Sequence, residues 1–266
     1  MARTDPTPLR PHARKRRDSI VVLPTYNEAQ NLRLVVPEIL RSSPYFDVLV
    51  VDDNSPDGTG ELAEQLAAEH PGRVRVLHRP GKLGLGRAYI DGFRHALALR
   101  YPRIFEMDAD LSHDPAALPS LREALDSADV VLGSRYVRGG ATLHWPIWRR
   151  ALSQAGSLYA ALILGLPFHD LTGGFKGFSA KVLRALDLDT IQSNGYAFQI
   201  EMTYRAYRLG FRIVERPIVF ADRRLGESKM HSGIVTEALR VVWDLRRAPA
   251  PAAATASEEP PASRAA

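Results

Sequence analysis

The stretch RIFEMDAD at residues 103–110 indicates the fold more clearly than any other part of the chain. Its first four residues are mostly apolar and follow Pro102, which predicts a short strand ending just before Asp108 and Asp110. The next residues, SHDP at 112–115, indicate a loop that begins a helix. Two carboxylates at a strand end can hold a divalent cation on a diphosphate, but they can equally be loop residues of which one caps the helix.

Strands and helices are expected to alternate on both sides of this stretch. Buried strands are predicted at residues 19–23, 46–51, 74–77 and 130–132. Helical patterns follow them, at about residues 32–40, 61–69, 87–100 and 116–127. This alternation predicts βαβ units, and hence an α/β fold with a mainly parallel sheet flanked by helices. Such sheets bind ligands beyond the carboxyl ends of their strands, where the acidic residues of this chain gather.

The pattern changes after Tyr136. Helices are expected at residues 145–166, 197–209 and 234–245, and a strand at 212–220. Pro217 should place that strand near an edge of the sheet, because proline cannot donate to a ladder of backbone hydrogen bonds. Pro37 likewise predicts a kink or an early end of the first helix. Asp52 and Asp57, which follow the second strand, are expected to cap helices.

Composition limits the classes of protein to which the chain can belong. Its 266 residues, 45% of them hydrophobic, suffice for one sizeable α/β domain with additions. The absence of cysteine excludes disulfides, thiolate metal sites and thiol nucleophiles. The net charge of +5 fits an anionic substrate, an anionic membrane surface or nucleic acid. No nucleic-acid reader motif occurs, so we expect no nucleic-acid partner.

Four segments are expected along the chain. Residues 1–18 should form a disordered basic arm, 19–230 the main domain, 231–247 an amphipathic C-terminal helix, and 248–266 a disordered tail rich in alanine and proline. No run of residues is long and uncharged enough to span a membrane. The helix after Trp145 could lie along a membrane surface or pack against the sheet, and the sequence leaves both readings open.

Several well-known site motifs are absent. The glycines at residues 81–86 do not form the dinucleotide-binding pattern, and neither a phosphate-loop motif, a nucleophile elbow nor a His-Glu-x-x-His zinc motif occurs. What remains is a site rich in carboxylates, with arginines arriving from later segments. Carboxylates with a cation can hold a nucleotide diphosphate, and arginines can hold a second anion. An enzyme that acts on nucleotide sugars needs both kinds of group.

Seven segments occur in an order that resembles a known family. They are VLPTYNE (22–28), VVDDNSPDGT (50–59), MDAD (107–110), GSRY (133–136), DLTGGF (170–175), NGYAFQIE (194–201) and DRRLGESK (222–229). Together they resemble glycosyltransferase family 2, and within it the polyprenol-phosphate mannose synthases. The resemblance implies a GT-A fold, Mg²⁺ or Mn²⁺ as cofactor, and inverting transfer of mannose from GDP-mannose to a polyprenyl phosphate. It also implies a peripheral place on the cytoplasmic face of a membrane, reached directly or through a separate membrane-anchoring subunit.

The same resemblance assigns roles to individual residues. The nucleotide pocket would be lined by Pro24, Tyr26, Glu28, Val51, Asp53, Asp108 and Ala109. The metal ion would be held by Asp108 and Asp110, and Ser112 stands where some relatives have a metal-binding glutamine. The catalytic group would comprise Asp110, Arg135, Arg223 and Lys229. The acceptor or the sugar would be positioned by Asp170, Gln199 and Glu201.

Three alternatives stay open at this point. A polyprenyl-phosphate glucosyltransferase that uses UDP-glucose would share the fold and the mechanism, since the motifs do not identify the sugar. A nucleotidyltransferase usually carries a basic, glycine-rich loop after its first strand, where this chain has PTYNE at residues 24–28. A non-catalytic membrane adaptor is disfavoured by the intact Asp108, Asp110 and Arg135.

Overall fold

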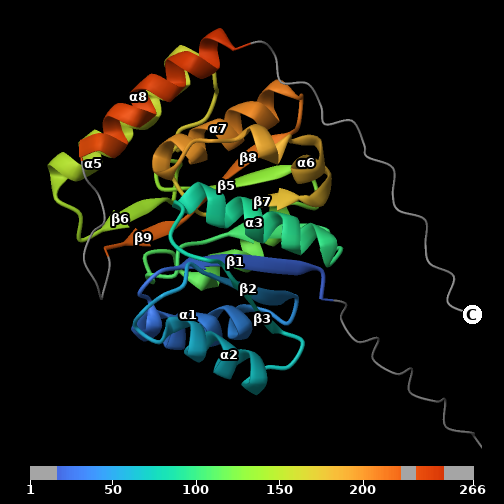
Figure 1. Ribbon diagram of the computed structural model, residues 1–266. Helices are drawn as coiled ribbons and strands as arrows, with labels where there is room; N and C mark the ends of the chain where they lie inside the picture. The colour runs from blue at the N-terminus through green and yellow to red at the C-terminus, as the bar shows by residue number, and fades with distance from the viewer. Residues whose placement is uncertain (1–16, 223–231, 249–266) are drawn as a thin grey trace, which may run out of the picture.

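A computed structural model describes residues 17–222 and 232–248 of the protein. Its centre is a seven-stranded sheet of order β3-β2-β1-β4-β7-β5-β8, with helices on both faces (Figure 1). The strands are β1 (Ser19–Thr25), β2 (Phe46–Asp52), β3 (Val74–His78), β4 (Arg103–Glu106), β5 (Val130–Ser134), β6 (Ala141–Leu143), β7 (Lys176–Ser179), β8 (Ile213–Pro217) and β9 (Val219–Ala221). The α-helices are α1 (Ala29–Ser42), α2 (Thr59–Glu69), α3 (Leu85–Ala98), α4 (Leu118–Ala124), α5 (Ile147–Leu164), α6 (Ala180–Ala185), α7 (Gly195–Arg208) and α8 (Ser232–Arg247).

The large sheet is parallel apart from β7, which runs antiparallel between β4 and β5. Because of this reversal, the first residue of β7, Lys176, lies opposite Glu106 at the end of β4. The loop that precedes β7 therefore lies at the carboxyl ends of the neighbouring strands, together with the loops that follow β1, β2 and β4. The mainly parallel α/β sheet agrees with the fold expected from the sequence.

Alternate strand residues supply two hydrophobic cores, one on each face of the sheet. Val21 and Leu23 of β1 belong to the core that includes α1, α2 and α4, whereas Ile20 and Val22 belong to the core that includes α3, α6 and α7. Gly92 lets α3 approach the sheet closely, because a Cβ at this position would lie 2.4 Å from Cγ1 of Val22. A smaller cluster joins α5, α7 and α8, and α5 and α8 lie side by side at the upper left of Figure 1.

Two predictions that depend on proline had different outcomes. The strand expected at 212–220 is divided into β8, which ends at Pro217 on the edge of the large sheet, and β9, which pairs with β6 in a second sheet. The predicted edge position is therefore confirmed. The predicted early end of the first helix is wrong, because α1 continues through Pro37 to Ser42. Burial of apolar residues such as Val36 and Ile39 outweighs the one backbone hydrogen bond that proline removes.

The first described residues, Arg17 and Asp18, are bonded to the main domain. Arg17 donates to the carbonyl of Gly72 at 2.9 Å, and Asp18 pairs with Arg103 and Arg122. The last two residues of the expected basic arm are therefore part of the fold. Residues 1–16 and the tail from 249 lie outside the described residues, and the helix expected at 231–247 is present as α8.

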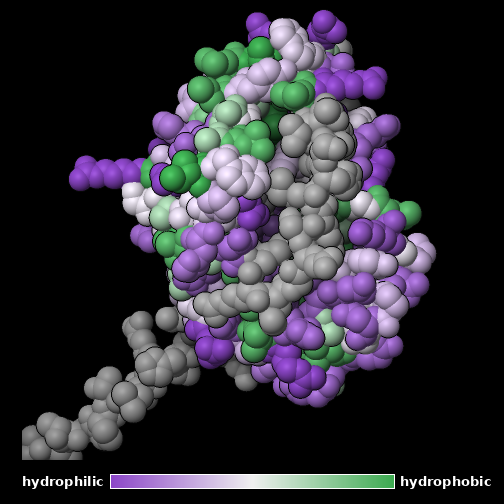
Figure 2. Space-filling view, turned by 90° about the vertical axis from the view of Figure 1, so that its left-hand side faces the viewer, coloured by the Kyte–Doolittle hydropathy of each residue, from purple (hydrophilic) through white to green (hydrophobic). Residues whose placement is uncertain are grey.

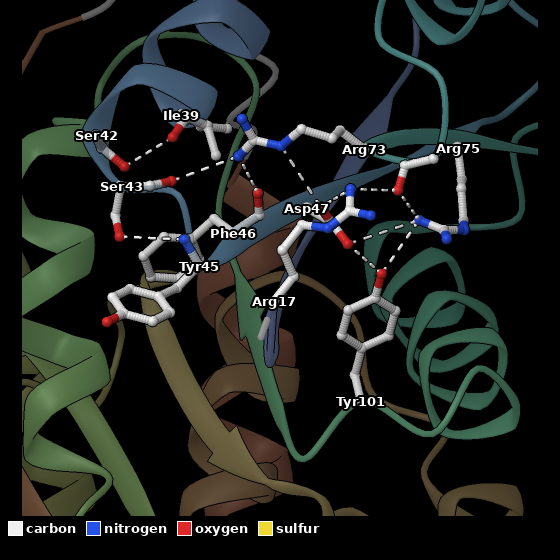
Figure 3. A network of polar contacts seen from close by, with 11 residues as sticks. Arg17, Ile39, Ser42, Ser43, Tyr45, Phe46, Asp47, Arg73, Arg75 and Tyr101 are labelled. Carbon is white, nitrogen blue, oxygen red and sulfur yellow. Dashed lines mark hydrogen bonds and ion pairs between the residues drawn. The ribbon is translucent and has the colours of Figure 1, made fainter. Parts of the chain in front are cut away.

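A polar network joins segments at the amino ends of the strands, opposite the edge at which ligands are expected (Figure 3). Its centre is Asp47 of β2, whose side chain is 3% exposed. Guanidinium nitrogens of Arg17, Arg73 and Arg75 lie 3.3, 3.7 and 3.9 Å from its carboxylate oxygens. The Tyr101 hydroxyl donates to the same carboxylate. Burial, together with this bond, raises the pKa of Tyr101 to about 12, so the hydroxyl remains a donor.

Replacing Asp47 by asparagine should lower the stability of the protein. The variant leaves three arginines without their counter-charge, but these side chains are partly exposed, so we expect a loss of about 1–3 kcal/mol in the free energy of unfolding. Asp126→Asn is the control, because it removes an ion pair with Arg103 at a carboxylate that is 56% exposed. It should change the free energy by less than about 0.5 kcal/mol. Urea unfolding measures both, and equal losses would contradict the central role of Asp47.

Candidate functional site

The loops after β1 and β2 are hydrogen-bonded to each other. The backbone N–H groups of Glu28 and Ala29 donate to Oγ1 of Thr59 and Oδ2 of Asp57, at 3.0 and 3.3 Å. Asp57 also accepts from the backbone N–H of Thr59 at 3.1 Å. It therefore serves N–H groups at the start of both α1 and α2, as expected for a capping residue. These hydrogen bonds hold the two loops together at the carboxyl edge of the sheet.

Asp52, the last residue of β2, and Asp53, which follows it, have different surroundings. Asp52 accepts from the backbone N–H and the hydroxyl of Ser55, so it braces the turn, and the prediction that it caps a helix is wrong. Asp53 forms a buried ion pair with Arg79, which also contacts Asp91 at 2.9 Å. Burial raises the pKa of Asp53 above its ordinary value, although Arg79 opposes this shift. Nη2 of Arg79 is buried and has no acceptor in the described residues, which leaves one donor beside Asp53 for a ligand.

The other residues expected in the nucleotide pocket lie around these loops. Pro24 stands opposite Val51 in the register of β1 and β2. Tyr26 lies under the ammonium group of Lys82, whose nitrogen is 4.6 Å from the ring centroid. Glu28 is half-buried directly before α1. Val51 is fully buried in the hydrophobic core, so its side chain is unavailable and only its backbone can meet a nucleotide.

Asp108 and Asp110 follow β4, and neighbouring groups hold both in place. The Tyr89 hydroxyl donates to the Asp108 carboxylate at 3.1 Å, and the backbone N–H of Asp108 donates to Nδ1 of His113 at 3.3 Å. Asp110 is 5% exposed, and its carboxylate accepts from the backbone N–H of Ser112 at 3.0 Å. The loop thus presents two ordered carboxylates at the end of a strand.

This arrangement fits a divalent cation whose coordination a substrate completes. In the described residues, no group of three or more His, Asp or Glu side chains is placed to hold a metal ion. Asp108 and Asp110, with the buried Ala109 between them, supply two carboxylates. Mg²⁺ is commonly held in this way, by one or two carboxylates together with substrate phosphates and water. The buried Ser112 hydroxyl has no partner within residues 17–222 and 232–248, so a metal-bound water could use it.

Two buried titratable residues lie behind the carboxylates. Glu106 and Lys176 face each other across β4 and β7, and both are buried. Burial raises the pKa of Glu106 to about 8 and lowers that of Lys176 to about 8, while the charge of each opposes the shift of the other. Lys176 also donates to the carbonyl of Gln199 at 2.7 Å and to the hydroxyl of Thr203 at 3.1 Å. These bonds anchor α7 to the sheet directly behind the site.

Arg135, just after β5, and Asp170, in the loop before β7, form a buried bidentate ion pair. Nε and Nη2 of Arg135 donate to the two carboxylate oxygens of Asp170, each at 2.7 Å, and its backbone N–H adds a bond of 2.9 Å. Nη2 also donates to the Thr172 hydroxyl. Burial alone would raise the pKa of Asp170, but Arg135 outweighs it and holds this pKa below its ordinary value. Among the described contacts, Nη1 of Arg135 remains for another anion.

The residues expected to position the acceptor or the sugar differ in their placement. A Cβ on Gly174 would lie 3.4 Å from Nε2 of Gln199 and 3.6 Å from a carboxylate oxygen of Asp108, so these side chains converge at the glycine. Glu201 pairs instead with Arg205, four residues along α7. Gln199 therefore borders the carboxylate loop, whereas Glu201 also accepts from the Ser193 hydroxyl, so its contacts join α7 to the segment before it.

His113, in the carboxylate loop, packs against the ring of Phe220, and Cζ of Arg135 lies 5.5 Å from the centroid of the same ring. The imidazole packs between Phe175 and Phe220, with centroids 5.0 and 5.1 Å away. Burial lowers its pKa to about 4, and Asp110 and Arg135 are both close enough to influence it in opposite directions. The imidazole is therefore neutral at pH 7 and can accept a backbone hydrogen bond through Nδ1. The carboxylate loop and the residue Arg135 therefore meet at the ring of Phe220, which both His113 and Arg135 contact.

Sequence and structure differ on which residues belong to the site. The predicted catalytic residues Arg223 and Lys229 lie outside the described residues, so their roles stay predictions. The structure adds Arg79, Tyr89 and His113, which the sequence did not single out. Arg79 directly follows the third strand, and parallel topology could have placed it at the same edge as the other polar residues. Tyr89 reaches the site only through the packing of α3.

A cavity of about 490 Å³ borders the carboxylate loop on the side of α1. Its lining includes Arg41, Ser112, His113, Leu143 and Val219. Among the predicted site residues that the structure describes, only Ser112 lines it, so the cavity lies beside the predicted nucleotide pocket and not within it.

Comparison with known proteins identifies the family. The chain matches the model of glycosyl transferase family 2 over residues 20–187. It belongs to glycosyltransferase family 2. It is 54% identical over 220 residues to an undecaprenyl-phosphate mannosyltransferase of Micrococcus luteus, covering 83% of this chain and 90% of that protein. It is 46% identical over 246 residues to a polyprenol monophosphomannose synthase of Mycolicibacterium smegmatis, covering 91% of each chain.

A solved structure supports the fold expected of a family 2 glycosyltransferase. The glucosyl-3-phosphoglycerate synthase of Mycobacterium tuberculosis, in complex with Mn²⁺, UDP and glucosyl-3-phosphoglycerate, matches with a TM-score of 0.66 at 20% identity. The match covers 91% of this chain and 88% of the other. The same enzyme has been solved with Mg²⁺ and UDP. At this identity the likeness concerns the fold alone, and it confirms the GT-A-like arrangement.

Removing the Tyr89 hydroxyl should weaken metal-dependent nucleotide binding. Tyr89→Phe keeps the ring that stacks on Phe93 but leaves Asp108 without this donor. Partners of metal-binding groups contribute strongly to metal affinity, so the Mn²⁺ concentration for half-maximal GDP binding should rise by about 3- to 30-fold. Tyr204→Phe, whose hydroxyl accepts from Arg208, is the control and should leave it unchanged. Calorimetric titration measures both, and an unaltered Mn²⁺ requirement in Tyr89→Phe would argue against Asp108 as a ligand.

Proposed function

We propose that this family 2 glycosyltransferase transfers mannose from GDP-mannose to the phosphate of a polyprenyl phosphate, with inversion at the anomeric carbon. The observation that carries the proposal is that His113 of the carboxylate loop and the guanidinium of Arg135 pack against the same ring, that of Phe220, at 5.1 Å between ring centroids and 5.5 Å from Cζ to the centroid. Carboxylates suited to a metal–diphosphate and a cation suited to a second phosphate thus share one edge of the sheet. The names of the two relatives at 54% and 46% identity support mannose and a polyprenyl phosphate as the groups involved.

The donor nucleotide is placed over the loops after β1 and β2. Asp53 offers acceptor oxygens and Arg79 an unpaired donor, a combination that suits the polar edge of a base or a ribose. Tyr26 and Lys82 border the same loops. Asp108 and Asp110 would hold Mg²⁺ or Mn²⁺, and the ion would supply positive charge to stabilise the departing diphosphate.

The attacking group needs no general base. A phosphate monoester has a second pKa near 6, so it is already largely dianionic at neutral pH. One of its oxygens forms a bond to the anomeric carbon while the bond to GDP breaks on the opposite face, and the electron pair of that bond leaves with GDP. Arg135 lowers the repulsion between the two phosphate groups and aligns the attacking oxygen, and Asp170 keeps the guanidinium in position. Arg223 and Lys229 are the further cations proposed for this step.

A transfer assay tests the donor, the acceptor and the carboxylates together. Purified protein, Mg²⁺ or Mn²⁺ and polyprenyl phosphate are incubated with labelled GDP-mannose or labelled UDP-glucose. We expect labelled lipid from GDP-mannose, reduced about a hundred-fold or more in Asp110→Ala. Asp114→Ala is the matched control, because this nearby carboxylate only caps a short helix. Labelled lipid from UDP-glucose alone would identify UDP-glucose as the donor in place of GDP-mannose. The absence of labelled lipid with either donor would contradict the proposed reaction.

An apolar and basic face on α5 and α8 supports a peripheral position on a membrane. Ile147, Trp148 and Leu162 of α5 are 88%, 68% and 72% exposed, and Trp243 of α8 is 44% exposed. Figure 2 shows hydrophobic side chains among hydrophilic ones in the upper part of this side of the molecule. Exposed cations on the same helices are Arg150, Arg240, Arg246 and Arg247. Such a face favours the surface of an anionic bilayer. Within the described residues, no helix has the length and apolar character needed to cross a membrane.

Replacing Leu162 by glutamate should weaken membrane binding. The leucine would lose its contact with the acyl boundary, and the new charge would be repelled by anionic headgroups, so binding should fall by about ten-fold or more. Leu34→Glu on α1 is the matched control, since Leu34 is 47% exposed on a helix away from this face. Co-sedimentation with vesicles that contain an anionic phospholipid measures both variants. Strong binding of the wild-type protein to these vesicles, with no other protein present, would also argue against a required membrane subunit. An equal loss of vesicle binding in both variants would contradict docking through α5.

A further inference from the structure

Trp145, between β6 and α5, carries a buried donor without an acceptor. Its ring packs edge-to-face on Phe220, with centroids 5.2 Å apart and an interplanar angle of 72°. The indole N–H is buried, and no acceptor among the described residues lies within hydrogen-bond range. An indole can only donate, and a buried one usually finds a partner. An unmet donor at this place therefore needs a physical explanation.

Two guanidinium groups flank the same ring. Cζ of Arg149 lies 4.3 Å from the centroid of Trp145, and Cζ of Arg135 lies 5.4 Å from it. Each guanidinium is held by a carboxylate, Arg149 by Asp222 and Arg135 by Asp170. The two ion pairs balance their own charges, and the donors that remain beside the ring, the indole N–H and Nη1 of Arg135, both require an acceptor oxygen. A ligand with several acceptor oxygens, such as a phosphate, therefore fits this place.

We propose that the indole N–H of Trp145 donates a hydrogen bond to the phosphate of the lipid acceptor, beside Nη1 of Arg135. The inference rests on the proposed function and adds a binding residue to it. The ligand class is a phosphate monoester carried on an apolar chain. Ile147 and Trp148, at the start of α5, are exposed apolar side chains close in sequence to the indole, and they offer a surface for that chain. Phosphate and chain are then recognised by adjacent residues.

The competing explanation is that the indole serves only as an apolar surface for Phe220 and the two arginines. Trp145→Phe separates the two explanations, because phenylalanine keeps an aromatic ring for these contacts and removes the N–H. Trp148→Phe is the matched control, since this tryptophan is 68% exposed and its N–H is open to water. A polyprenol without phosphate is the matched control ligand.

The experiment measures binding and turnover separately. Calorimetry gives the dissociation constants of a short-chain polyprenyl phosphate and of GDP, and the transfer assay gives the KM of each substrate. Hydrogen bonds to charged groups are stronger than neutral ones, so Trp145→Phe should weaken acceptor binding and raise the acceptor KM by about ten-fold or more. GDP affinity, the donor KM and the melting temperature should stay close to those of the wild type. Trp148→Phe should leave the phosphate contribution to acceptor binding unchanged.

Each outcome of these measurements supports or contradicts the inference about Trp145. Unchanged acceptor affinity in Trp145→Phe would overturn the inference, and an equal loss of GDP affinity would show a structural role instead. An equal loss for polyprenol would show that the indole contacts the chain and not the phosphate. If the wild-type protein binds polyprenyl phosphate through Trp145 but transfers no mannose, the proposed function fails and the inference holds. If it transfers mannose without any dependence on Trp145, the inference alone fails.

Discussion

The buried ion pair between Arg135 and Asp170 is the contact on which the proposed acceptor side of the site depends. Both side chains are almost fully removed from water, which is costly unless the charges are completely paired. The pairing is supplied by three hydrogen bonds from Arg135 to Asp170 and one to Thr172. Glu215 of β8 holds the loop from the other side by accepting from the backbone N–H groups of His169 and Asp170. Changing either partner would leave a buried charge uncompensated.

The reversed strand β7 makes this ion pair possible. Had β7 been parallel to its neighbours, the loop before it would lie at the amino edge, far from the end of β5. Because it is antiparallel, the loop with Asp170 reaches Arg135 at the carboxyl edge. The same reversal places Lys176 opposite Glu106, where its ammonium group donates to Gln199 and Thr203 of α7 behind the acidic loop. The proposed donor side of this glycosyltransferase is thus built from the ends of parallel strands, and the proposed acceptor side from the end of β5 and the loop before the antiparallel β7.

Buried donors and acceptors without partners occur beside the groups that are proposed to bind ligands. Within the described residues these include Nη2 of Arg79, the Ser112 hydroxyl and the indole N–H of Trp145. Folded proteins satisfy nearly all buried polar atoms, so such groups mark places where a substrate or a water completes the structure. At the amino edge, Nε of Arg73 is also buried without a hydrogen bond, but it lies 3.7 Å from the Asp47 carboxylate, so an ion pair within the protein already meets its charge.

The amino-acid sequence by itself determined the α/β class, the family resemblance and the position of Asp108 and Asp110 at a strand end. These features depend on periodicity and on short segments, which are local in the chain. Only the tertiary structure decided that Asp53 pairs with Arg79 and that the side chain of Val51 belongs to the core. Such contacts join residues that are distant in sequence, and strand order together with helix packing brings them together. Local patterns carry no information on those distances, which is why the partners of the site residues could not be predicted from the sequence.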